Sequence, residues 1–180
     1  MLAGESPAEG LGSRTVILRS TRKLLNLLGK RAVMLVDAPA SDDDWYANLL
    51  WLDRRKCLLI VHAGTLFPIF VSDVRISDLR PIGRRIVDLL TVALLEEELP
   101  IDALGPLAPD DVRVAKTASR HVLGVMNEMA FECAWHVDQA GGLWNISAHE
   151  LNRHLRRSLH TKDGQYRVPL ELVRERLQSR

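Results

Sequence analysis

The sequence lacks the features that mark secreted and membrane-spanning proteins. Of its 180 residues only two are cysteine, Cys57 and Cys133, and both lie in apolar runs, so we expect buried free thiols rather than a disulfide framework. No apolar run approaches the roughly 20 residues that are needed to cross a bilayer. The first residues have neither the basic nor the apolar region of a secretion signal. These absences predict a cytoplasmic protein without a membrane association.

An excess of charge of one sign is missing as well. The 24 Lys and Arg residues balance 23 Asp and Glu residues to a net charge of +1, so no global field draws the chain to nucleic acid or to an anionic membrane. Residues 141–180 carry eight basic against four acidic side chains. We therefore expect a modestly basic C-terminal end, which is more often a solvated surface than a binding groove.

The signature motifs of common enzyme and metal sites are also absent. There is no Walker loop, G-x-S-x-G elbow, G-x-G-x-x-G loop or kinase signature. His149 and His154 are five residues apart, whereas a zinc-protease helix needs a spacing of four. His136 and Asp138 have no partner at metal-binding spacing. The acidic segment at 37–44 lacks the alternating oxygen ligands and the distal Glu of a calcium loop. The sequence predicts no metal site, no cofactor and no identifiable catalytic residue.

A hydrophobic content of 47% is typical of a globular chain. Residues 1–13 are small, acidic and contain Pro and Gly, which predicts a disordered leader before a single domain at 14–180. Residues 45–71 predict a three-stranded β-meander, joined by strands at 15–19 and 112–116. We expect an α+β fold, in which an antiparallel sheet with this central meander has helices packed mainly on one face.

Within the meander, the segment D-R-R-K at 53–56 predicts a four-residue turn between the first two strands. Pro68 in the third strand indicates an edge strand or a bulge. Arg54 and Arg55 at the hairpin tip are candidates for contact with phosphate, although basic side chains at such a tip often stay hydrated.

The stretch from Val114 to Trp135 predicts a strand that turns into a long helix. At helical spacing its core stripe contains Val122, Met126, Met129, Ala130, Cys133 and Val137. The opposite stripe contains Arg120, Gly124, Asn127, Phe131 and Trp135. Because a glycine inside a helix costs about 1 kcal/mol relative to alanine, we expect another group to approach the backbone at Gly124.

Two interpretations of this polar stripe remain open. Lys116, Thr117 and Arg120 surround a helix start, where free N–H groups and a guanidinium favour an anion, and Asn127 adds an amide. In the alternative, Arg120 pairs with an acid of the loop at 37–44 and Asn127 ties down a neighbouring strand. His121 and Glu128 share a flank of the same helix and suggest acid–base chemistry, although exposed neighbours of this kind are common.

Four motifs together resemble a bacterial family of unknown function: W-Y-A-N-L at 45–49, D-R-R-K-C at 53–57, K-T-A-S-R-H-V-L-G-V-M-N-E-M-A-F at 116–131 and E-L-N-R at 150–153. The resemblance covers roughly residues 15–170. It implies that the family pattern includes Trp45, Asn48, Arg120, Gly124 and Asn127. It implies no activity, and His121 departs from the small polar residue that is commoner at its position.

Three hypotheses for function follow. The first is a recognition module that binds a protein partner or nucleic acid. The second is a small-molecule or nucleotide-binding protein with an anion pocket at 116–127. The third is a hydrolase or nuclease that uses His121, Glu128 and Arg120. The candidate binding residues are Trp45, Asn48, Arg54, Arg55, Lys116, Thr117, Arg120 and Asn127. The sequence does not distinguish a ligand face from a dimer interface.

Overall fold

The computed structural model describes residues 15–29 and 34–180, so the leader expected at 1–13 lies outside the described residues. None of the helices in these two ranges is long and apolar enough to cross a membrane. In chain order the elements are β1 (Val16–Ser20), α1 (Arg22–Leu28), β2 (Trp45–Leu52), β3 (Arg55–His62), β4 (Pro68–Val71), η1 (Ile76–Leu79), α2 (Ile82–Glu96), η2 (Pro109–Asp111), β5 (Val112–Lys116), α3 (Arg120–Gln139), η3 (Leu143–Asn145), α4 (Ala148–Arg157), β6 (His160–Lys162), β7 (Gln165–Arg167) and α5 (Pro169–Gln178).

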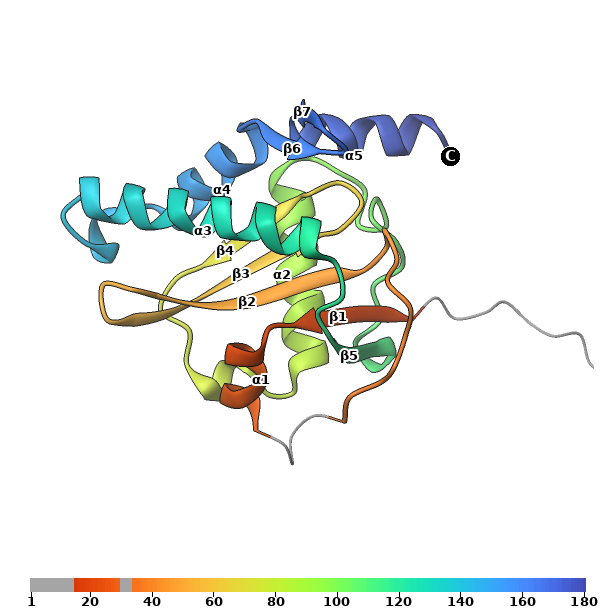
Figure 1. Cartoon of the computed structure of the whole chain (residues 1–180), viewed down its shortest axis with the longest axis horizontal. Coiled ribbons are helices and arrows are strands. Elements are labelled where there is room, and N and C mark those ends of the chain that lie inside the picture. The colour runs from red at the N-terminus through yellow and green to blue at the C-terminus, as the bar shows by residue number, and fades with distance from the viewer. Residues whose placement is uncertain (1–14, 30–33) are drawn as a thin grey trace, which may run out of the picture.

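Five strands form one sheet in the order β4-β3-β2-β1-β5 (Figure 1). The predicted meander is confirmed, because β2 is antiparallel to β3 and β3 is antiparallel to β4. The prediction of an antiparallel sheet is wrong, because β1 runs parallel to both β2 and β5. Parallel neighbours require a long crossover, and here the chain returns through α1 and the loop that follows it. The fold is α+β with a mixed sheet.

The β2–β3 hairpin closes with a tighter turn than the sequence predicts. Asp53 and Arg54 adopt φ values of 47° and 60°, which is the left-handed pair of a two-residue type I′ turn. The register places Leu52 opposite Arg55, so the four-residue turn at 53–56 is wrong by two residues. One Asp53 carboxylate oxygen accepts a hydrogen bond from the Leu143 backbone N–H at 3.1 Å. This bond ties the hairpin tip to the connection between α3 and α4.

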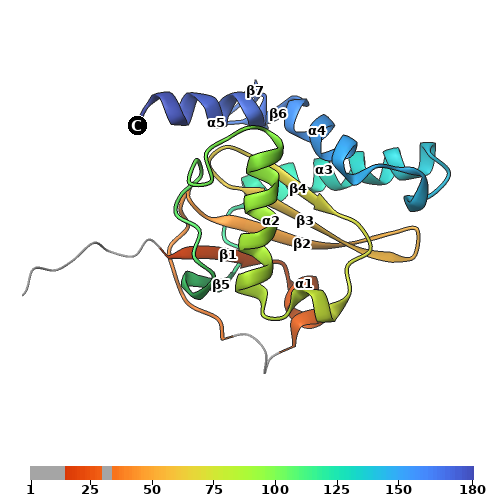
Figure 2. The same ribbon diagram turned by 180° about the vertical axis from the view of Figure 1, so that it is seen from behind.

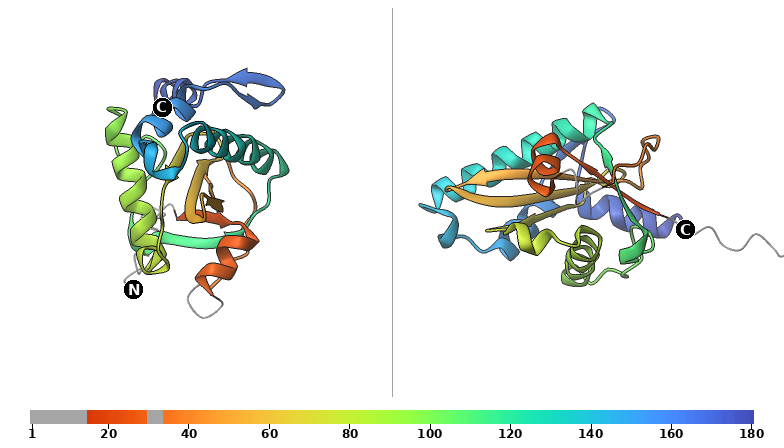
Figure 3. Two further views of the ribbon diagram at one scale, coloured as in Figure 1. Left: turned by 90° about the vertical axis from the view of Figure 1, so that its left-hand side faces the viewer. Right: turned by 90° about the horizontal axis from the view of Figure 1, so that it is seen from below.

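Helices cover both faces of the sheet, so the prediction of helices mainly on one face is wrong (Figures 2 and 3). On one face Trp45, Ala47 and Leu49 join a core with α1, α2 and α5. On the other, Tyr46 and Leu50 join a core with α3 and α4. Nearly every position of β2 and β3 is buried, which is typical of strands that are covered on both sides.

The outer strand β4 is capped along its edge by α4. Pro68 lies on this edge strand, as predicted. The buried Asn152 side chain accepts from the Phe70 backbone N–H at 2.7 Å and donates to the Phe70 carbonyl at 2.9 Å. The Arg156 Nε atom donates to the Pro68 carbonyl at 3.3 Å. These side chains satisfy backbone groups that an uncovered edge would present to another chain.

Two buried arginines join separate elements of the fold. Arg19 in β1 pairs with the buried Asp44 and donates to the carbonyls of Lys116, Ala38 and Pro39. Arg156 in α4 pairs with Glu96 and Glu97 at the end of α2. The guanidinium of Arg156 also lies 4.8 Å from the centre of the Phe67 ring. A further residue, Arg157, donates to Glu97 at 2.6 Å.

Candidate functional site

Helix α3 presents the predicted polar stripe to solvent. Ser119 begins the helix, because its side chain accepts from the Val122 N–H at 3.3 Å and its own N–H donates to the Tyr46 hydroxyl at 3.0 Å. The predicted core stripe faces the sheet and is buried, apart from the half-buried Ala130. On the outer stripe Phe131 is 76% exposed and Trp135 is 52% exposed. We call Arg120, Gly124, Asn127, Phe131 and Trp135 the α3 outer stripe.

The two pairings of the structural interpretation are not found among the described residues. Within residues 15–29 and 34–180, neither Arg120 nor Asn127 makes a side-chain hydrogen bond or ion pair, and both side chains are exposed. The acidic loop is held instead by Arg19, which binds Asp44, and by Arg176, which binds Asp43. The stripe therefore remains available for contacts outside this chain.

Apart from its own turn of helix, a Cβ built on Gly124 meets no described atom within 4 Å, so the expectation that another group of this chain approaches the backbone there is wrong for the described residues. We therefore expect Gly124→Ala to raise the free energy of unfolding by about 1 kcal/mol, since alanine is the better helix former. Denaturant unfolding of the two proteins measures the difference. A destabilised variant would contradict the exposed position of Gly124. A stabilised variant that binds a partner less well would show that the bare backbone serves recognition rather than folding.

The predicted anion pocket at the start of α3 is only partly assembled. A hollow of about 460 Å³ is lined by Lys116 and Thr117, but Arg120 and Asn127 do not line it. The hollow also includes Asp37, whose carboxylate opposes an anion. The Lys116 carbonyl accepts from Arg19 at 3.0 Å, so this junction is in part a structural one.

Trp45 and Asn48 lie inside the fold rather than on its surface. Trp45 is 1% exposed and packs edge-on against His62, with ring centres 4.8 Å apart. Burial lowers the pKa of His62 to about 3, so this imidazole is neutral. Asn48 accepts a hydrogen bond from the Thr21 hydroxyl at 2.9 Å. These contacts give both residues a scaffolding role.

The hairpin tip combines cations with exposed tryptophans that the sequence reasoning missed. Trp51 is 59% exposed and Trp144 is 67% exposed. Lys56 lies 4.8 Å from the Trp51 ring centre, and Arg55 lies 5.1 Å from the Trp144 ring centre. Arg55 also pairs with an Asp73 oxygen at 3.4 Å, whereas the exposed Arg54 has no ion pair among the described residues. In the sequence, the position of Trp51 beside the predicted hairpin turn could have indicated an exposed tryptophan.

A hollow joins the hairpin tip to the C-terminal half of α3. Its volume is about 510 Å³, and its lining includes Trp51, Ala134 and Asp138. At helical spacing Asp138 falls on the same side of α3 as Phe131 and Trp135. The tip and this end of the helix lie at the same end of the molecule (Figure 1). We call Trp51, Phe131, Trp135 and Trp144 the tryptophan surface. Of these four residues Trp51 lines the hollow. It alternates along β2 with Leu50 and Leu52, which face α3, so its side chain leaves the sheet on the other face.

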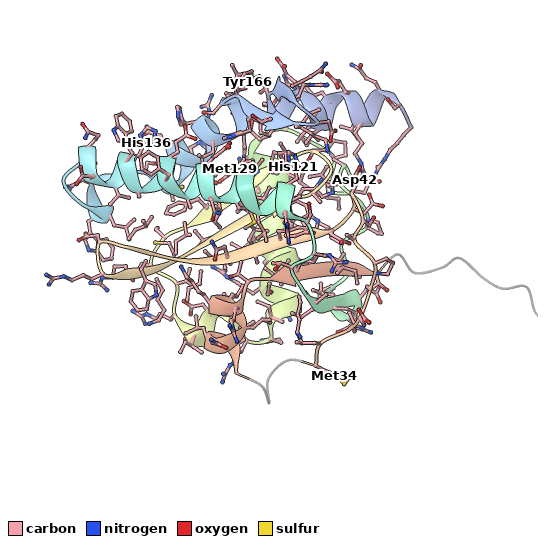
Figure 4. All side chains as sticks on the ribbon, viewed as in Figure 1. Met34, Asp42, His121, Met129, His136 and Tyr166 are labelled. Carbon is pink, nitrogen blue, oxygen red and sulfur yellow. The ribbon has the colours of Figure 1, made fainter. Side chains whose placement is uncertain are left out.

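The proposed acid–base residues are not brought together. His121 and Glu128 are exposed, and no hydrogen bond or ion pair joins them in the described part of the chain. Figure 4 places His121 near the N-terminal end of α3 and His136 near its other end.

A different group of titratable residues converges between α3 and α4. The potential ligand atoms of Glu132, His136 and His154 all lie within 4.8 Å of one another. Local spacing missed this group because its members come from two helices, while His149, which was compared with His154, pairs with Glu96 at 3.3 Å. In the part of the chain that the structure describes, these three side chains are the group that could hold a metal ion.

Comparison with known proteins identifies the family but no activity. No curated protein and no solved structure matches the chain. The model of one family, described as a domain of unknown function (DUF6933), matches residues 17–172. The match spans the sheet, both helical layers and the tryptophan surface. It supports the resemblance to a family of unknown function, and the chain belongs to the DUF6933 family.

Proposed function

We propose that the protein is a non-enzymatic recognition module that binds a protein partner on the tryptophan surface. The observation that carries this proposal is that three of the four tryptophans, Trp51, Trp135 and Trp144, are 52–67% exposed at one end of the molecule. Exposed apolar groups that gather in one place mark interaction sites. Tryptophan and arginine are also the residues that contribute most to binding at protein interfaces.

The charge around this surface favours a protein over nucleic acid. Helix α3 carries one guanidinium, Arg120, against three carboxylates, Glu128, Glu132 and Asp138. The tip cations are partly engaged, because Arg55 pairs with Asp73. Nucleic-acid binding depends on many cations that neutralise phosphates, and this surface does not gather them.

The same geometry indicates the chemistry of the partner. At the hairpin tip Arg54 is exposed and carries no ion pair within the described ranges, and a guanidinium binds a carboxylate through a planar pair of donors. The hollow of about 510 Å³ accepts an apolar side chain. We therefore propose a partner segment with apolar side chains and a single Asp or Glu that reaches Arg54. The free thiols of Cys57 and Cys133 support the proposal that it meets this partner in the bacterial cytoplasm.

Site-specific photo-crosslinking in cells tests the proposal. A photoreactive amino acid is introduced at Trp135 or at Trp144, and at Val92 as a control, because Val92 is 55% exposed on α2, which covers the opposite face of the sheet. We expect the first two positions to capture the same protein and Val92 to capture none of it. We expect the captured protein, once purified, to bind wild type at least about tenfold more tightly than it binds the Trp135→Ala variant. Truncation of an anchoring tryptophan costs more than about 1.4 kcal/mol of binding free energy.

Other results would overturn the assignment in distinct ways. If positions 135 and 144 crosslink only to a second copy of this chain, the tryptophan surface is a dimer interface. If the protein binds single-stranded RNA or DNA with steep salt dependence, and Trp51→Ala removes that binding, the partner is nucleic acid. If all three positions capture the same proteins, the surface is not specific.

A further inference from the structure

Glu132, His136 and His154 form a compact cluster on the facing sides of α3 and α4. Glu132 and His136 are four residues apart in α3, so their side chains share one face of the helix. His154 enters from α4, and its Nε2 atom lies 2.6 Å from a Glu132 carboxylate oxygen. The rings of His136 and His154 meet edge to face, with centres 4.7 Å apart. The cluster borders the tryptophan surface, because the His136 ring also packs edge to face against Trp135, with ring centres 5.0 Å apart.

We propose that these three side chains bind one divalent transition-metal ion, with Zn²⁺ as the best fit. Two imidazoles and one carboxylate form a donor set that zinc takes in its open sites, where water completes the coordination. Nitrogen donors also select against Mg²⁺ and Ca²⁺, which prefer oxygen ligands.

Only small movements of side-chain ends are needed to close the site. In a tetrahedral zinc site with bonds of about 2.0–2.1 Å, neighbouring ligand atoms lie about 3.3 Å apart. The Glu132–His154 pair opens slightly from 2.6 Å, and His136 closes in from a separation of at most 4.8 Å. The His154 side chain is 48% exposed and that of Glu132 is 25% exposed, so both have room to rotate without disturbing the core.

Groups around the cluster suit a cation. The Ser158 hydroxyl donates to Glu132 Oε1 at 3.2 Å, which is the kind of outer bond that orients a metal-binding carboxylate. His160 lies in β6, which packs against α3. Its burial lowers its pKa, although Glu132 acts in the opposite direction. A neutral imidazole at this position adds no positive charge that would repel the ion.

The cluster also has an open side. A hollow of about 440 Å³ between α3 and α4 is lined by both imidazole ligands and by Glu150. Three protein ligands beside a hollow leave space for water or a small exchangeable ligand, as in zinc sites that are not closed by a fourth side chain. The second carboxylate, Glu150, helps to balance the charge of the ion. The inference does not rest on the proposed partner.

Metal titration of the chelator-treated full chain tests the site. We expect wild type to bind one equivalent of Zn²⁺ in competition with a chromophoric chelator, and to bind Co²⁺ with visible absorption. His136→Gln and His154→Ala are expected to weaken the affinity for Zn²⁺ by more than about 100-fold, the upper end of what loss of an outer-shell partner costs. Affinity should also fall as the pH is lowered, because protons compete with the metal ion for its ligands.

The matched control is His149→Ala. His149 lies on the same helix as His154 and is similarly exposed, but it pairs with Glu96 outside the cluster. This variant should bind Zn²⁺ as wild type does. The His136→Gln variant leaves the Glu132–His154 contact in place, so a loss of Zn²⁺ affinity in this variant cannot come from the loss of that contact. Thermal unfolding of the variant checks that it remains folded. Absence of a one-to-one complex, or equal affinity in wild type and His136→Gln, would overturn the proposal.

Discussion

Asp44→Ala is expected to lower the free energy of unfolding by about 3–5 kcal/mol, the cost of leaving one member of a buried ion pair without its partner. The side chains of Arg19 and Asp44 are each 3% exposed. The Asp44 carboxylate also accepts from the Ser41 N–H at 3.0 Å, so its loss frees the loop as well. Denaturant unfolding followed by circular dichroism measures the change.

The neighbouring residue provides the control. Asp43 pairs with Arg176 near the surface, where the Asp43 side chain is 59% exposed. Asp43→Ala is therefore expected to cost less than about 1 kcal/mol. If the two variants are equally stable, Arg19 finds sufficient compensation in the carbonyls of the loop and of β5, and the ion pair is not what secures this loop.

Arg156→Met is expected to lower the free energy of unfolding by about 3 kcal/mol, the lower end of the range for a broken buried ion pair. The Arg156 side chain is fully buried and the Glu97 side chain is 2% exposed, so methionine fills the space but leaves Glu97 with fewer donors. The remaining bonds from Arg157 moderate the loss. Arg153→Met, at an exposed position of the same helix, should change stability by less than about 0.5 kcal/mol.

The pH dependence gives this prediction a second readout. Burial acts to raise the pKa of Glu97, but the hydrogen bonds from Arg157 and Arg156 outweigh it and hold the pKa below its ordinary value. A carboxyl group with a lowered pKa stabilises the fold above its unfolded pKa of about 4.3, and this contribution is lost as pH falls through the folded value. Wild type should therefore lose stability in acid more steeply than Arg156→Met. Parallel curves would contradict this assignment.

Local patterns predicted the elements of this fold better than their assembly. The meander and the core stripe of α3 follow from alternation and helical spacing, and both are confirmed. The parallel pairing of β1 with β2 and β5 was missed, because residues of similar β-propensity suit either orientation. The turn at Asp53 and Arg54 was also misjudged, since neither residue is the glycine that usually marks left-handed backbone.

For the candidate site, the sequence identified a surface but not its contacts. Helical spacing correctly placed Arg120, Gly124 and Asn127 on one exposed stripe. It did not reveal that Trp144 reaches the hairpin tip, or that His154 meets Glu132. Both contacts depend on how α3, η3 and α4 fold back on one another, and no local spacing encodes that arrangement.

The position of β1 between β2 and β5 has a consequence for how the chain folds as it is synthesised. Of the five strands, β1 is synthesised first. One of its two neighbours in the sheet is β5, where Val112 pairs with Val16, although the two residues are far apart in the sequence. The meander of β2, β3 and β4 has only short-range pairings, so it can form while the rest is still being made. Closing the sheet at β5 carries a large loop-closure cost and comes late. Until then one side of β1 is an unpaired, apolar strand edge, and the nascent protein is most prone to aggregation at that stage.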